Sequence, residues 1–83
     1  MHEESLQIAM DGLTQIESDD NLPKSVKIKV KSARDYLNNK DNVLNLRIDK
    51  SLEELESIVD DPNLPDYTRM QIWRVVSLLE SRD

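Results

Sequence analysis

The chain has 83 residues, 34% of them charged, with no cysteine and a net charge of -6 at pH 7. This length favours one domain (residues 1–83), the lack of cysteine excludes disulfides and thiolate metal sites, and the acidic balance disfavours a general nucleic-acid binder. No apolar run approaches the roughly 20 residues of a membrane span, and the N-terminus is acidic where a signal peptide is basic. The sequence therefore predicts a cytoplasmic protein without a membrane segment.

The first expected helix covers residues 3–17, because apolar side chains recur there at intervals of three and four. Gly12 weakens this helix and is expected where another helix packs closely. The helix ends at the phrase IESDDNLP (residues 16–23), whose Asp and Asn residues are typical of turns and N-caps. Leu22 precedes a proline and is therefore extended, which predicts that its side chain plugs the turn.

The second expected helix covers residues 23–38 and carries an apolar stripe and a separate basic stripe. The basic stripe consists of Lys24, Lys27, Lys31 and Arg34. It lacks interleaved aromatic residues, and both flanking segments of the chain are acidic. Charge pairing within the bundle or with an acidic partner is the favoured explanation, and nucleic-acid binding is the less favoured one. The helix is expected to end at Asn38 and Asn39, with asparagine in the left-handed conformation.

The third expected helix covers residues 42–59, with Asp41 as its N-cap. The fourth covers residues 65–81, and its apolar arc is wider than one bundle seam requires. A single Trp on such an arc is more often in the core, but Trp and Tyr are also enriched at binding hot spots. The candidate partner-binding residues are Tyr67, Met70, Trp73 and Leu78.

The phrase recurs as IVDDPNLP in residues 58–65, at an offset of 42 residues. The same offset matches core positions of the two halves, about residues 1–41 and 42–83, but sets Lys31 against Trp73. The chain is therefore expected to be a tandem repeat of a helical hairpin. We expect an all-α, four-helix antiparallel up-and-down bundle, with a HEAT-like stack as the alternative.

Two segments resemble a known family. Residues 60–81 read DDPNLPDYTRMQIWRVVSLLES, and residues 19–41 read DDNLPKSVKIKVKSARDYLNNKD. Both resemble the small archaeal group catalogued as uncharacterised protein family 0147, most distinctively in the turn that is followed by Arg69, Ile72, Trp73 and Ser77. The resemblance implies an all-helical bundle from an archaeal cytoplasm, and it brings no activity and no catalytic residues.

No catalytic arrangement is recognisable in the sequence. The acid pairs at residues 19–20 and 60–61 are suited to acid–base catalysis or cation binding, but their roles in turns and helix caps explain them. The lone His2 lies in a terminus that is expected to fray. A Gly-rich phosphate loop and a nucleophile elbow are both missing. The sequence thus predicts a non-enzymatic interaction module with no metal, no cofactor and no small-molecule substrate.

The expected partner is a second copy or another protein, bound through the fourth helix. The alternative is a nucleic-acid or ribonucleoprotein accessory protein that uses the basic stripe.

Overall fold

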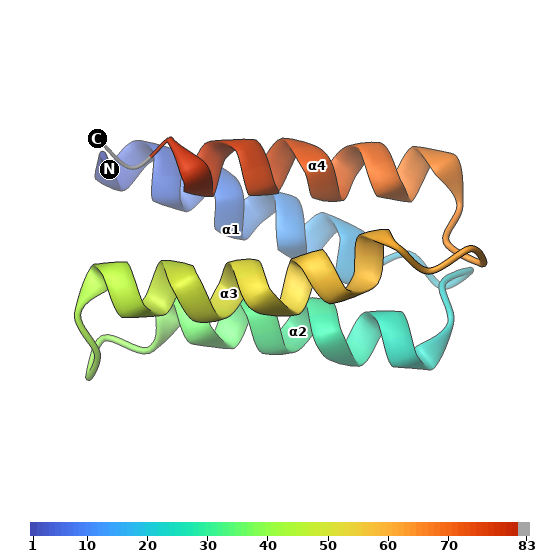
Figure 1. The fold of residues 1–83 in the computed structure, drawn as a ribbon, viewed down its shortest axis with the longest axis horizontal. Helices are drawn as coiled ribbons and strands as arrows, with labels where there is room; N and C mark the ends of the chain where they lie inside the picture. Colours follow the sequence, from blue (N-terminus) through green and yellow to red (C-terminus); the bar gives the residue numbers. More distant parts are fainter. Residues whose placement is uncertain (82–83) are drawn as a thin grey trace.

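The computed structural model describes residues 1–81, and these form four α-helices joined by short turns. The helices are α1 (Glu3–Glu17), α2 (Lys24–Asn38), α3 (Leu44–Val59) and α4 (Asp66–Glu80). All four expected helices are present, and their ends differ from expectation by two residues or fewer. Consecutive helices run in opposite directions along a body of 33 × 21 × 20 Å (Figure 1).

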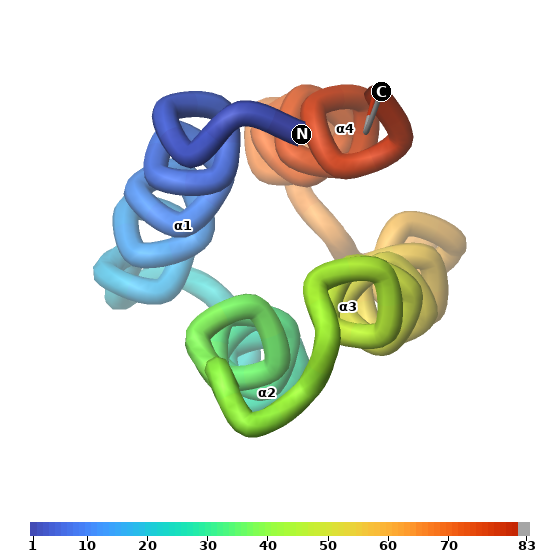
Figure 2. The backbone as a smooth tube through the Cα atoms, turned by 90° about the vertical axis from the view of Figure 1, so that its left-hand side faces the viewer, coloured from blue at the N-terminus to red at the C-terminus, as the bar shows by residue number. Residues whose placement is uncertain are grey.

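The helices form a ring in chain order. Figure 2 shows α1, α2, α3 and α4 at four corners, with the start of α1 and the end of α4 at the same end of the bundle. Each helix packs against its two neighbours, and within residues 1–81 no Cα atoms of diagonally opposite helices approach within 8 Å. The predicted all-α antiparallel bundle is therefore confirmed, and the HEAT-like stack is not adopted.

Both halves of the sequence contribute to the core, and the second half contributes more buried residues than the first. At the 42-residue offset, eight pairs of positions are buried in both halves. The pairs are Ala9/Ser51, Leu13/Leu55, Ile16/Ile58, Leu22/Leu64, Val26/Thr68, Val30/Ile72, Ala33/Val75 and Leu37/Leu79. The two hairpins therefore share these eight core positions, and Leu22, which was predicted to plug its turn, is matched by the buried Leu64.

Gly12 lies where α1 packs against α4. A Cβ atom at this position would lie 3.1 Å from Cγ2 of Val75, which is closer than side chains normally approach. The close helix contact expected from the lone glycine is confirmed.

The same turn is built three times, although its sequence phrase is recognisable only twice. In each turn a backbone N–H donates to the side chain of the residue two positions earlier. These donor and acceptor residues are Asn21 and Asp19 (2.9 Å), Asp41 and Asn39 (3.1 Å), and Asn63 and Asp61 (2.9 Å). Asn42 and Val43 replace the Leu-Pro pair in the middle turn, which hides its relation to the other two.

The predicted helix caps are wrong. Pro23, Val43 and Pro65 occupy the N-cap positions of α2, α3 and α4, and none of them makes a side-chain cap hydrogen bond. The acidic residues of the turns lie too many positions before these helices to cap them, because the turn itself places further residues between each acid and the first helical N–H groups. Asn39 also stays at negative φ, so the predicted left-handed conformation is wrong as well.

Two arginines close the second and third turns. Arg47 in α3 donates to the carbonyl oxygen of Leu37 from Nε, at 2.9 Å, and also from Nη2. Arg69 in α4 donates to the carbonyl oxygens of Val59 from Nε, at 3.0 Å, and of Asp61 from Nη2, at 2.8 Å. Leu37 and Val59 lie in the last turns of their helices, where carbonyls have no partner within the helix, so the guanidinium groups supply the missing donors. Asp61 follows α3, and its carbonyl oxygen also accepts from the N–H of Leu64.

Candidate protein interface on the last helix

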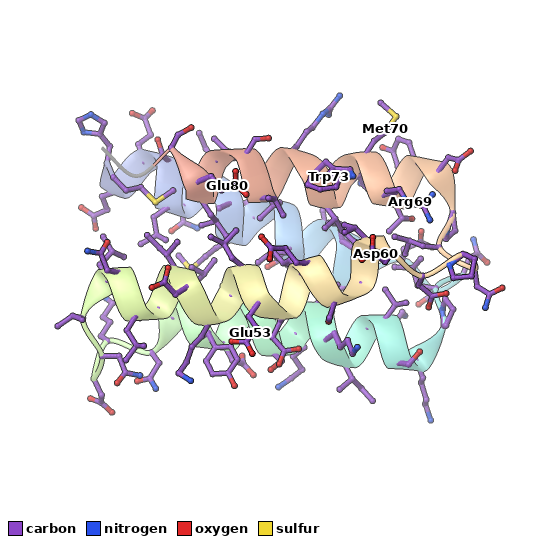
Figure 3. All side chains as sticks on the ribbon, in the orientation of Figure 1. Glu53, Asp60, Arg69, Met70, Trp73 and Glu80 are labelled. Atoms are coloured by element: carbon purple, nitrogen blue, oxygen red, sulfur yellow. The ribbon has the colours of Figure 1, made fainter. Side chains whose placement is uncertain are left out.

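Three of the four predicted partner-binding residues, Tyr67, Met70 and Trp73, lie on the outer side of α4, whereas Leu78 packs against the edge of the core. Tyr67, Met70 and Trp73 are 69%, 59% and 48% exposed, and Leu78 is half-buried. Figure 3 shows Met70 pointing away from the other helices and Trp73 on the side of α4 that faces the viewer. Sequence spacing thus brings these four side chains to one outer surface of the bundle.

The core position considered for Trp73 is wrong for the single chain. The inward side of α4 is filled by Ile72, Val75, Val76 and Leu79, all of them buried. Trp73 lies about 100° around the helix from Ile72, which takes it past the seam between α3 and α4. Half of its surface therefore remains in contact with water.

A shallow groove of about 660 Å³ runs along the outer side of α4. All of its lining residues belong to this helix or, in the case of Ser81, directly follow it. They are Met70, Trp73, Arg74, Ser77, Leu78 and Ser81. Ser77 and Ser81 are small, so the groove owes its depth to the longer side chains around them.

A second hollow of about 280 Å³ adjoins this groove between α1 and α4. Ile8, which is 53% exposed, lines it from α1, and Tyr67 lines it from α4. Arg74 and Leu78 line both the groove and the hollow, so the two form one continuous surface. Sequence reasoning did not include Ile8 in the site, and its position outside the apolar stripe of its helix is the signal that identifies it.

This surface is called the α4 face below. Its members are Ile8, Tyr67, Met70, Trp73, Arg74, Ser77, Leu78 and Ser81. Arg74 is the one charged residue among them. Trp, Tyr, Met and Arg are enriched in protein–protein interfaces, whereas Lys, Glu, Asp, Ser and Ala are depleted. The α4 face thus contains four residue types that are enriched in protein–protein interfaces.

The basic stripe of α2 is largely paired within the molecule. Its ion pairs join Lys27 to Asp20 (3.6 Å), Lys31 to Asp35 (3.1 Å) and Arg34 to Glu17 (3.0 Å). Lys24 is exposed and makes no ion pair with any residue in the described part of the chain. The three lysines also line a groove of about 470 Å³, together with Glu17 and the exposed Ile28.

The paired acids do not converge on a chemical site. Asp19 and Asp61 accept the hydrogen bonds that close their turns. Among the described residues, no three His, Asp or Glu side chains lie together as metal ligands do. None of the four helices is long and apolar enough to cross a membrane, as far as residues 1–81 are concerned.

The fold and the α4 face define a small antiparallel four-helix protein with an apolar, partly uncovered last helix. The chain belongs to the Uncharacterised protein family (UPF0147), whose model matches residues 1–81. The UPF0147 protein of Methanosarcina mazei is 42% identical to it over 69 residues, which cover 83% of this chain and 74% of that protein. The family resemblance predicted from the two turn segments is confirmed.

Two solved structures are similar over nearly the whole chain. The crystal structure of the unknown function protein MMP1188 has a TM-score of 0.94 at 30% identity, and the match covers 100% of this chain and 94% of that chain. A UPF0147 protein from Thermoplasma acidophilum has a TM-score of 0.92 at 25% identity, with 98% and 95% covered. The chain therefore shares its four-helix fold with a solved member of the family.

Proposed function

We propose that this protein is a non-enzymatic, cytoplasmic interaction module that self-associates through the α4 face. The observation that carries the proposal is the exposure of Tyr67, Met70 and Trp73 on one helix. Complete burial of one large apolar side chain contributes about 1.5–3 kcal/mol. A partner that covers the exposed parts of three such side chains therefore gains several kcal/mol, and aromatic anchors dominate interfaces of this kind.

The charges of the helices support a second copy as the partner. A two-fold symmetric interface sets each surface against itself, so a strongly charged face repels its own copy. Acidic residues outnumber basic ones in α1 and α3, and basic residues outnumber acidic ones in α2. In α4 the two acids and two bases balance, so this helix meets its own copy with the least repulsion.

Sedimentation velocity at micromolar concentrations tests the proposal. Met70→Glu places a charge on the α4 face, and we expect it to convert the wild-type dimer to a monomer. Ile28→Glu is the matched control, because Ile28 lies at the equivalent position of the first hairpin and is 65% exposed, against 59% for Met70. The control is expected to remain dimeric. A wild-type protein that stays monomeric in this range overturns the proposal.

Trp73 reports on the same association, because it is the one tryptophan of the chain. Its fluorescence is expected to shift to shorter wavelength as protein concentration rises and the ring leaves water. Trp73→Ala should weaken association while changing the stability of the monomer little, because half of the side chain is already exposed. A loss of about 3–5 kcal/mol in the monomer, the size typical of a buried Trp, contradicts an interfacial role.

A second candidate function is that of a nucleic-acid or ribonucleoprotein accessory protein. Its support is the groove lined by Lys24, Lys27 and Lys31, which offers three cations to a phosphate backbone. It has less support than self-association, because two of these lysines already have carboxylate partners. Reversing Lys27 and Lys31 to Glu should abolish salt-sensitive retention on RNA without unfolding the domain. A wild-type protein that RNA does not retain removes this candidate.

A further inference from the structure

We infer that two copies pair their α4 helices antiparallel, with Met70 of each copy packed over Ser81 of the other and Arg74 over Ser77. The inference rests on the proposed self-association and adds to it a direction and a register. It places the two-fold axis midway between residues 75 and 76 of the paired helices.

Four residues of the groove lie along one line of the helix surface. They are Met70, Arg74, Ser77 and Ser81, separated by intervals of four, three and four residues. Helices that pack along a seam contact each other at these intervals. Trp73 and Leu78 stand on opposite sides of this line and form the walls of the seam.

The side chains on this line change size halfway along it. Met70 and Arg74 in the first half are long, and Ser77 and Ser81 in the second half are short. A parallel pair in register sets each residue against its own copy, which crowds the long residues and leaves a void between the serines. The antiparallel pair sets every long side chain against a serine. Protein interfaces pack as densely as protein interiors, so complementarity favours the antiparallel pair.

The charges give independent support for the same direction. Within residues 1–81, neither Arg74 nor Glu80 makes an ion pair, and the last turn of α4 has no basic residue. In the antiparallel register, Arg74 lies about 4.5 Å along the axis from Glu80 of the second copy, against about 9 Å in a parallel pair. It also lies over the last turn of that helix, where a positive charge is favourable.

Disulfide cross-linking distinguishes the two directions, because the wild-type chain has no cysteine. The single variants Met70→Cys and Ser81→Cys are oxidised separately and as an equimolar mixture. We expect a cross-linked dimer from the mixture alone, because in the antiparallel pair identical positions at 70 or 81 lie about 16 Å apart along the axis, too far for a disulfide. A cross-link of similar yield from either variant alone indicates a parallel pair and overturns the inference.

Sedimentation of the same samples separates this inference from the proposed function. If the variants sediment as dimers but no sample cross-links, the antiparallel register is wrong and self-association stands. If the wild-type protein is a monomer, both are wrong.

A charge exchange provides a second test that introduces no cysteine. Arg74→Glu is expected to weaken dimerisation about tenfold or more, because it sets two acids against each other across the interface. The double variant R74E/E80R should return the dissociation constant to within about threefold of the wild-type value. Residues six apart do not face each other on one helix, so this recovery reports a contact between copies. A double variant that is folded by circular dichroism and dimerises no better than R74E overturns the register.

Discussion

The ion pair between Glu17 and Arg34 marks a place where the two hairpins differ in chemistry. Glu17 Oε2 lies 3.0 Å from Arg34 Nη1, and both side chains are about three-quarters buried. At the 42-residue offset the second hairpin has Val59 and Val76, which are both buried. We predict that the double variant E17V/R34V is more stable than the wild-type protein.

The size of the effect follows from two opposing contributions. Two unit charges 3.0 Å apart attract by about 5.5 kcal/mol at an effective dielectric constant of 20, and lost hydration offsets most of this. We expect a net contribution of about 1–2 kcal/mol from the pair, above the ~0–1 kcal/mol of an exposed one. Two valines buried to three-quarters contribute about 2–4 kcal/mol, part of which the methylene groups of Arg34 already supply. The double variant should therefore gain about 1 kcal/mol, within the range found when apolar residues replace buried ion pairs.

Urea denaturation followed by circular dichroism measures the free energy of unfolding of the wild type, both single variants and the double variant. Arg34→Val alone is expected to lower it by about 2 kcal/mol, because the carboxylate of Glu17 stays largely buried and loses its charged partner. The double variant should recover this loss and exceed the wild type. A double variant less stable than either single variant refutes the reasoning, because the valines then fail to pack at positions where the second hairpin buries them.

Three further changes test contacts inside the bundle by the same measurement. Ser51→Ala should raise the free energy of unfolding by about 1 kcal/mol, because Ser51 Oγ is buried without a hydrogen-bond partner in residues 1–81 and Ala9 fills the matching position; a loss of stability contradicts this. Arg69→Ala should lower the free energy of unfolding by about 2 kcal/mol, because two backbone carbonyls lose their charged donor. Arg69→Lys should not restore the lost stability, because an ammonium group lacks the fork geometry of the guanidinium group. A lysine variant as stable as the wild type argues against a role for this fork. Gly12→Leu should lower the free energy of unfolding by about 1–3 kcal/mol, because the new side chain must displace Val75 of α4. Unchanged stability would mean that α1 and α4 can move apart without an energetic cost.

Periodicity and proline placement were sufficient to predict the helices and their order. Leu22 was predicted to plug its turn because it precedes a proline, and both Leu22 and its counterpart Leu64 are buried. The use of the Asp and Asn side chains was not predictable, because one side-chain oxygen suits a turn or a cap equally well. Only the number of residues between it and the next helix decides which N–H group it reaches. The turn at Asn39 was hidden because its hydrogen bond needs none of the leucine and proline of the recognisable phrase.

The candidate site was only partly predictable, for a different physical reason. A residue about 100° from the centre of the core stripe, as Trp73 is, becomes buried or exposed according to how closely the neighbouring helix approaches. The sequence gives the angular position of Trp73 on its helix but not the distance between α4 and the neighbouring helix. Ile8 and Tyr67 come together across the α1–α4 seam, which a single-helix pattern does not report. The carbonyl contacts of Arg69 likewise depend on where one helix ends relative to the next.

The difference between Lys31 and Trp73 is the strongest internal argument for our proposal. The two residues hold equivalent positions in hairpins that bury the same eight pairs of side chains. A lysine at this position is compatible with the hairpin, so the fold alone does not require a large aromatic ring there. An exposed tryptophan lowers solubility and stays half in water in the single chain. A contact outside the chain gives the ring a role that the bundle does not, and for that reason we place the proposed interface on α4 and its control on α2.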